Sequence, residues 1–105
     1  KLVEIGAMPL INGSVGLTNK ETRIRFTGID DVHRFYTPDA KDALISSSDV
    51  FSIALVHSPE MAHEAASMGY DLYLCGHTHG GQIISKGKKP LVSHVANHRH
   101  LSTGF

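Results

Sequence analysis

The sequence contains a single cysteine and no long apolar run. One cysteine excludes an intrachain disulfide and favours a reducing compartment, so we expect a cytoplasmic protein. A helix that spans a bilayer needs about 20 consecutive apolar residues, and no stretch of the chain approaches that length. We therefore expect membrane association only through amino-terminal sequence that is missing from this chain.

An excess of charge of either sign is also missing, because ten basic and ten acidic side chains cancel. This balance indicates neither a nucleic-acid partner nor a membrane-surface partner. The charges are nevertheless uneven, since every acidic residue lies at or before Asp71 and the last third of the chain is basic. A basic last third would suit an anionic substrate, and an ordinary solvated surface explains it equally well.

Short apolar segments alternate with turn signals through the first half of the chain. Residues 14–18 and 22–29 flank a polar turn and predict a β-hairpin. Residues 9–12, which begin with a proline, predict a short edge strand. Residues 37–45 open with a threonine–proline pair and predict a capped helix.

Residues 51–75 predict a strand–helix–strand unit. Residues 51–57 indicate a buried strand, residues 61–68 a helix that stops at Gly69, and residues 70–75 a second buried strand. The connection has the length of a parallel crossover, which places both strands in one sheet with the same direction. The fold class that follows is α/β.

Histidines follow both of these strands. His57 ends the first, and His77 and His79 lie in the loop after the second, where three glycines, beginning with Gly76, can take backbone conformations closed to other residues. Because the carboxyl ends of adjacent parallel strands lie about 5 Å apart at one edge of a sheet, we expect the imidazoles to converge. A lone histidine at a strand end is more often a polar cap, but three together favour a transition-metal site. We therefore predict His57, His77 and His79 as metal ligands.

Carboxylates for a second metal are scarce. A hydrolytic site with two metals about 3.5–4 Å apart needs acidic ligands, preferably one that bridges both ions. Asp30 and Asp31 follow a strand and are expected only to terminate it, whereas Asp71 precedes its strand and should lie at the opposite end of the sheet. Glu60 is expected to interact with the helix dipole.

Cys75 lies inside the apolar strand predicted at residues 70–75 and is expected to be a small buried hydrophobe. A cysteine nucleophile paired with His57 or His77 is an alternative hypothesis that requires an exposed thiol of low pKa. The apolar neighbours argue against it, so we rank Cys75 below the histidines.

Three stretches together resemble a known family. Residues 55–59 (Leu-Val-His-Ser-Pro) and 76–82 (Gly-His-Thr-His-Gly-Gly-Gln), with residues 28–31 (Gly-Ile-Asp-Asp), resemble the calcineurin-like metallophosphoesterases, in particular their bacterial YkuE-like branch. The resemblance implies that residues 1–105 are the carboxyl-terminal part of a single metallophosphoesterase domain. The implied fold is the carboxyl half of a two-layer sandwich that contains a hairpin and a parallel βαβ unit.

The resemblance also implies a set of roles. His57 and His77 would bind one divalent ion and His79 a second, with manganese, iron or zinc as the metals, for hydrolysis of a phosphoester or pyrophosphate. The family's aspartate-bearing motifs do not occur in this sequence, so we assign no catalytic residue within it and expect those residues upstream of Lys1. The full-length parent is expected to be active on a phosphorylated small-molecule or lipid-linked substrate, and the isolated chain to be inactive.

A non-catalytic module is the alternative. Such a module would bind one zinc through the same three histidines, or a protein partner, without hydrolysis. Half of a sandwich would also leave an apolar sheet face exposed, which favours a homodimer of the chain through that face.

Overall fold

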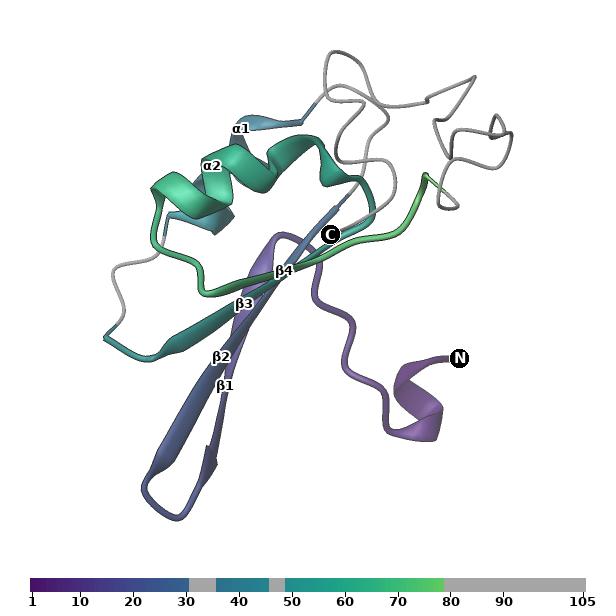
Figure 1. Ribbon diagram of the computed structural model, residues 1–105. Helices are drawn as coiled ribbons and strands as arrows, with labels where there is room; N and C mark the ends of the chain where they lie inside the picture. The colour runs from purple at the N-terminus through teal and green to yellow at the C-terminus, as the bar shows by residue number, and fades with distance from the viewer. Residues whose placement is uncertain (31–35, 46–48, 79–105) are drawn as a thin grey trace, which may run out of the picture.

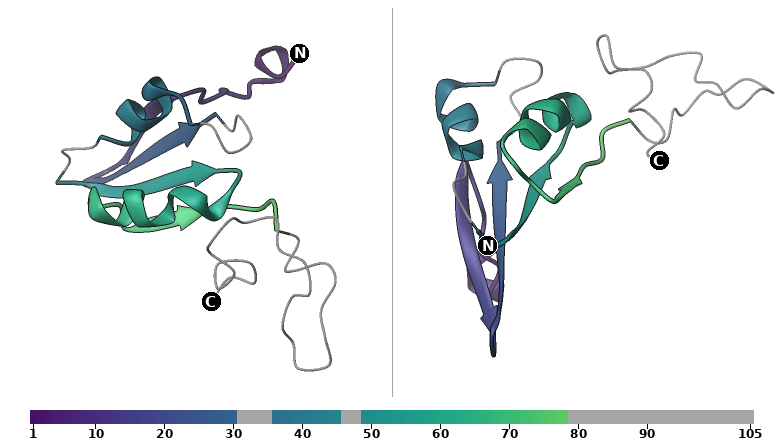
Figure 2. Two further views of the ribbon diagram at one scale, coloured as in Figure 1. Left: turned by 90° about the horizontal axis from the view of Figure 1, so that it is seen from above. Right: turned by 60° about the vertical axis from the view of Figure 1, so that its left-hand side comes forward.

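The computed structural model describes residues 1–30, 36–45 and 49–78, and these residues form a four-stranded mixed sheet in the order β1-β2-β3-β4 (Figure 1). Helices α1 and α2 pack on one face of this sheet (Figure 2). The element bounds are β1 Gly13–Asn19, β2 Thr22–Ile29, α1 Pro38–Leu44, β3 Phe51–Val56, α2 Ala62–Ser67 and β4 Leu72–Leu74, with short 3-10 turns at Val3–Ile5 and Pro59–Met61. The predicted α/β class is confirmed.

Strands β1 and β2 form the predicted hairpin. They pair antiparallel, with Gly13 opposite Gly28 at one end and Asn19 opposite Thr22 at the other. The turn end of the hairpin extends well past β3 and β4 (Figure 1).

Strands β2, β3 and β4 run parallel. Ile29 at the end of β2 lies opposite Val56 at the end of β3, and Leu55 lies opposite Leu74 at the end of β4. The predicted parallel strand–helix–strand unit is therefore confirmed. Its two strands are direct neighbours that end at the same edge of the sheet.

Both helical segments begin at side-chain caps, and the cap of the first is the predicted one. Thr37 Oγ1 accepts a hydrogen bond from the Ala40 amide at 3.2 Å, with Pro38 at the first helical position. Ser58 Oγ accepts a hydrogen bond from the Glu60 amide at 3.3 Å, at the start of the turn that leads into α2.

No helix in the described part of the chain combines the length and the apolar character needed to cross a membrane.

The core lies between the sheet and the two helices. Apolar side chains from β2, β3, both helices and the turn before α2 form one buried cluster: Ile29, Ala40, Leu44, Ala54, Val56, Met61 and Ala65. Tyr70 and Tyr73 pack against this cluster from the β4 side. The removal of these apolar side chains from water stabilises the layered arrangement.

The opposite face of the sheet, called the open face below, is also apolar. Because side chains alternate along a strand and paired residues share a face, the register places on it Val15, Leu17, Ile24, Phe26, Phe51, Ile53, Leu55, Leu72 and Leu74. Neither α1 nor α2 covers this face, and Phe51 and Leu74 are 50% and 48% exposed. The prediction that the β4 run is a buried strand is therefore wrong. Within the described residues β4 is the edge of the sheet.

Residues 9–12 do not form the predicted edge strand. Leu10 instead lies against Gly28 on the open face, so closely that a Cβ on Gly28 would collide with the Leu10 side chain and carbonyl oxygen. The following turn is fixed by the Asn12 side chain, whose Oδ1 accepts a hydrogen bond from the Asp30 amide at 2.9 Å. Leu10 thus covers part of the sheet, and residues 9–12 do not lengthen its edge.

Candidate metal centre

His57 and His77 leave the sheet at the same edge. His57 is the first residue after β3, and His77 is the third after β4. The Gly76 amide donates a hydrogen bond to the His57 carbonyl oxygen at 2.9 Å, which continues the contact between the two chain segments beyond the end of β4. Neighbouring backbones therefore carry the two histidines, as the parallel crossover predicts.

The two imidazole rings meet. His77 Nδ1 lies 3.1 Å from His57 Nε2, and the ring centroids are 4.9 Å apart with an interplanar angle of 68°. His57 is exposed and His77 half-buried, so the pair lies at the surface. The predicted convergence of these two residues is thus observed. His79, the third predicted ligand, lies outside the described residues, and its role stays a prediction.

His77 has an unusual backbone conformation. Its φ is 66°, in the left-handed region that favours glycine. The Thr78 amide donates a hydrogen bond to the Gly76 carbonyl oxygen at 2.8 Å, so His77 is the central residue of a tight three-residue turn. We expected the glycines of this loop to take the conformation closed to other residues, but Gly76 does not have a positive φ. The strained position in this part of the loop is a predicted ligand.

Tyr73 on β4 contacts the backbone next to His57, and the sequence pattern does not single out this tyrosine. Its hydroxyl donates a hydrogen bond to the Ser58 carbonyl oxygen at 2.6 Å. Ser58 directly follows His57 and is buried. The only sequence signal for this contact is a polar hydroxyl in an otherwise apolar strand, which must find a partner when the ring is buried.

The aspartates lie as expected where the structure describes them. Asp71 Oδ2 accepts a hydrogen bond from the Ser52 amide at 2.8 Å, at the amino end of β3 and therefore opposite to the histidine edge. Asp30 is exposed and follows β2. Asp31 is not among the described residues. No group of three or more histidine, cysteine, aspartate or glutamate side chains in the described residues is placed to hold a metal ion.

Cys75 is exposed, so the prediction that it is a buried hydrophobe is wrong. The reason is the edge position: β4 ends at Leu74, and Cys75 follows it. Partial burial of the sulfur still raises the pKa of the Cys75 thiol above its ordinary value. A nucleophilic cysteine needs a lowered pKa, so this environment argues against the cysteine hypothesis.

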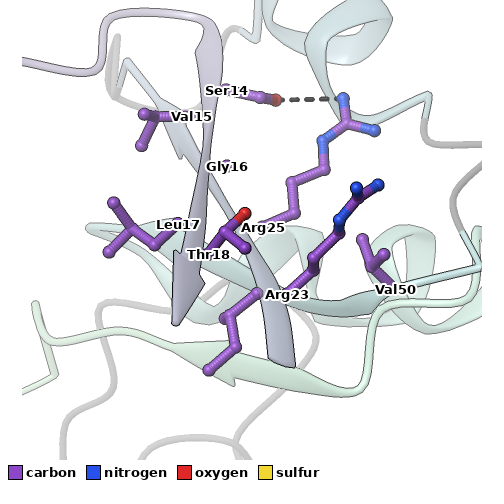
Figure 3. Close-up of a pocket in the computed structure, with 9 residues that line it drawn as sticks. Ser14, Val15, Gly16, Leu17, Thr18, Arg23, Arg25 and Val50 are labelled. Atoms are coloured by element: carbon purple, nitrogen blue, oxygen red, sulfur yellow. Dashed lines mark hydrogen bonds between the residues drawn. The ribbon is translucent and has the colours of Figure 1, made fainter. Parts of the chain in front are cut away.

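A separate hollow of about 440 Å³ is lined by the β1–β2 hairpin and Val50 (Figure 3). Arg25 donates a hydrogen bond from Nη2 to Ser14 Oγ at 3.1 Å along its wall. Arg25 pairs with Ser52, the second residue of β3, whereas His57 follows the last residue of that strand. The hollow therefore lies at the opposite end of β3 from the histidine pair.

The spacing of the two ring nitrogens is compatible with a shared divalent ion. Two imidazole nitrogens that bind one tetrahedral zinc at about 2.0–2.1 Å lie about 3.3 Å from each other. The observed separation of 3.1 Å between His57 Nε2 and His77 Nδ1 is close to this value. The same distance also suits a hydrogen bond from one ring to the other. Imidazole nitrogen is a ligand that iron and zinc readily accept.

Comparison with known proteins points to the same chemistry. Over 73 residues the chain is 41% identical to the protein named "Uncharacterized metallophosphoesterase YkuE" from Bacillus subtilis (strain 168). The chain is therefore similar to part of a protein named as a metallophosphoesterase. The match covers 69% of this chain and 25% of that protein, so the aligned stretch spans about a quarter of the relative's length. It lies in the carboxyl-terminal part of the relative. No family model and no solved structure matches the chain.

The metallophosphoesterase relationship confirms the resemblance that the two histidine motifs indicated. The mixed sheet with its hairpin and parallel βαβ unit agrees with part of a metallophosphoesterase domain. The relative's name supports phosphoesterase chemistry at the level of the family.

Proposed function

We propose that this chain contributes the histidine edge of a divalent-metal site in a phosphohydrolase of the calcineurin-like type. The observation that carries the proposal is the 3.1 Å separation of His57 Nε2 and His77 Nδ1 at the carboxyl edge of parallel strands. That edge is where open α/β sheets bind ligands. The parent protein would hydrolyse a phosphoester or pyrophosphate bond in a phosphorylated small-molecule or lipid-linked substrate.

The residues of this chain hold and orient the metals. His57 and His77 would share one ion, and His79 would bind the second. When bound, two divalent ions supply the Lewis acidity that polarises a phosphoryl oxygen and activates water for attack. The exposed ring of His57 leaves this side of the site open to an anionic substrate.

The acidic ligands would come from other sequence of the parent protein. Among the described residues the histidine pair belongs to no group of three metal-binding side chains. A two-metal site needs bridging carboxylates, and Asp71, which hydrogen-bonds at the other end of β3, cannot supply one. We therefore propose that the 105-residue chain alone binds metal weakly and does not hydrolyse phosphoesters.

Metal titration of histidine variants tests the proposal. His57→Ala and His77→Ala should each weaken Co²⁺ binding by at least about tenfold, because each removes one of two converging nitrogens. Isothermal titration calorimetry and the visible spectrum of Co²⁺ report the affinity and the ligand set. His63→Ala is the control, since His63 is an exposed histidine on α2 that is not a predicted metal ligand. Equal affinity in wild type and both variants would show that the pair is only a histidine–histidine hydrogen bond.

A non-catalytic module is the second candidate. It is favoured by the absence of a three-residue ligand group within the described residues and by the exposed open face. Manganese-dependent hydrolysis of bis(p-nitrophenyl) phosphate separates the two candidates, if it is measured on a longer protein that carries this sequence and acidic ligands. Hydrolysis that His57→Ala abolishes supports the phosphohydrolase, and metal binding without hydrolysis supports the module.

A further inference from the structure

The hydroxyl of Tyr73 reaches from β4 to the backbone beside His57. Tyr73 pairs with Ala54 in the register of β3 and β4, on the face that the helices cover. Its hydroxyl donates a hydrogen bond to the carbonyl oxygen of Ser58 at 2.6 Å. A short bond from a half-buried donor is stronger than the same bond in water, because the local dielectric is low.

A second hydrogen bond holds the other side of the same bend. The Gly76 amide donates to the His57 carbonyl oxygen at 2.9 Å. Tyr73 and Gly76 belong to the segment that ends in His77. This segment therefore donates hydrogen bonds to two consecutive carbonyl oxygens, those of His57 and Ser58. These hydrogen bonds thus connect the backbone at His57 and Ser58 to β4 and the residues after it, which lead to His77.

We propose that Tyr73 is a positioning residue that holds His57 in register with His77 through its hydrogen bond to Ser58. The metal-binding part of this inference rests on the proposed function. The geometric part rests only on the two hydrogen bonds and the 3.1 Å ring contact. Tyr73 acts through the backbone and does not itself touch the metal.

The hydroxyl remains a donor over the whole pH range of an ordinary assay. Burial, with a smaller effect of Tyr36, raises the pKa of Tyr73 well above its usual range. The bond to Ser58 therefore does not switch with pH, and its loss must be produced by substitution.

Tyr70 is a matched control for a purely structural role. It packs against the same core cluster as Tyr73. Its hydroxyl is buried and has no hydrogen-bond partner among the described residues. A change to phenylalanine removes one hydroxyl and keeps the ring in both positions, so the two variants differ mainly in the loss of the bond to Ser58.

The experiment compares Tyr73→Phe with Tyr70→Phe in the 105-residue chain. We expect Tyr73→Phe to weaken Co²⁺ affinity by about tenfold, the lower end of the effect of outer partners that orient metal ligands. Hydrogen exchange by NMR in the metal-free chain should show the Gly76 amide exchanging at least about threefold faster in Tyr73→Phe, since that amide depends on the same bend. Tyr70→Phe should change neither quantity beyond any shift in its global unfolding free energy.

Each outcome decides a different claim. If wild type binds Co²⁺ and the two tyrosine variants bind it equally, Tyr73 is a core residue and the inference is overturned. If wild type binds no Co²⁺, the proposed metal site fails. Gly76 exchange then decides the geometric claim, which stands if only Tyr73→Phe accelerates it and is overturned if both variants match wild type.

Discussion

At the scale of single residues, the candidate site depends on backbone conformation as much as on side-chain chemistry. His77 has a φ of 66°, in a region that costs an L-residue about 1–2 kcal/mol. Such a conformation persists only where the surroundings fix it, and strained residues cluster at functional sites. Here the Gly76–His57 and Thr78–Gly76 hydrogen bonds fix the turn.

The strain at His77 predicts a reversal of the usual ranking of substitutions. His77→Gly should unfold with a free energy about 0.5–1 kcal/mol higher than His77→Ala, because glycine takes a positive φ at no steric cost and this outweighs its larger entropy in the unfolded state. Urea denaturation followed by circular dichroism measures the difference. Both variants should lose metal affinity equally.

An alanine variant more stable than the glycine variant would mean that the turn relaxes once the imidazole is removed. In that case the left-handed conformation is a consequence of the ring contact with His57. The contact between the two rings would then be what stabilises the left-handed backbone conformation of His77.

Residue-level features divide clearly into those that the sequence predicts and those that it does not. The meeting of His57 and His77 is predicted, because it depends only on two parallel strands ending at one edge. The left-handed φ of His77 and the reach of Tyr73 to Ser58 are not predicted. Both depend on distances between segments that no local pattern encodes.

At the scale of elements, the contacts of Leu10 and Asn12 with β2 and the residue after it fix the path of the chain into β1. Leu10 occupies the space above Gly28, where only a glycine avoids a collision. Asn12 then closes the turn through its bond to the Asp30 amide. The contacts of Leu10 and Asn12 therefore fix the carboxyl end of β2, which lies at the same edge of the sheet as the histidine pair.

Substitution of Gly28 tests this contact. Gly28→Ala should destabilise the chain by about 1–3 kcal/mol, the range of forced overpacking. Gly16→Ala is the control, because nothing lies within 4 Å of a Cβ placed there, and alanine in a strand should be neutral or slightly stabilising. Thermal unfolding of both variants provides the comparison. An equal effect of the two substitutions would show that Leu10 does not pack on Gly28 in solution.

The elements themselves are largely predictable. The caps at Thr37 and Ser58 and the alternation in the hairpin indicate their helices and strands, because the relevant interactions are local. The exposure of Leu74 and Cys75 is not predictable in this way. An apolar run predicts a strand, but whether that strand is central or at an edge depends on what pairs with it.

At the scale of the whole molecule, the sheet is apolar on both faces and covered by helices on one. The open face carries large side chains with substantial exposure, among them Leu17 at 57% and Phe51 at 50%. Soluble proteins rarely leave a contiguous apolar patch of this kind without a partner. We propose that a second copy of the chain covers this face.

We therefore expect the 105-residue chain to self-associate through the open face. Sedimentation equilibrium at micromolar concentration should detect dimers, and Leu17→Lys together with Phe51→Lys should shift the equilibrium to monomer, because each places a charge in the interface. Ile45→Lys is the control, since Ile45 is equally exposed but follows α1 on the other side of the sheet. Dimers that persist in the double variant would place the contact elsewhere.

The parallel crossover has one further consequence for a chain without disulfides. An ion held by His57 and His77 would join two points that are 20 residues apart and enclose α2 between them. Such an ion would cross-link the strand–helix–strand unit. At concentrations well above its dissociation constant, it would raise the free energy of unfolding in proportion to the logarithm of the free ion concentration. Metal binding and folding would then be thermodynamically coupled.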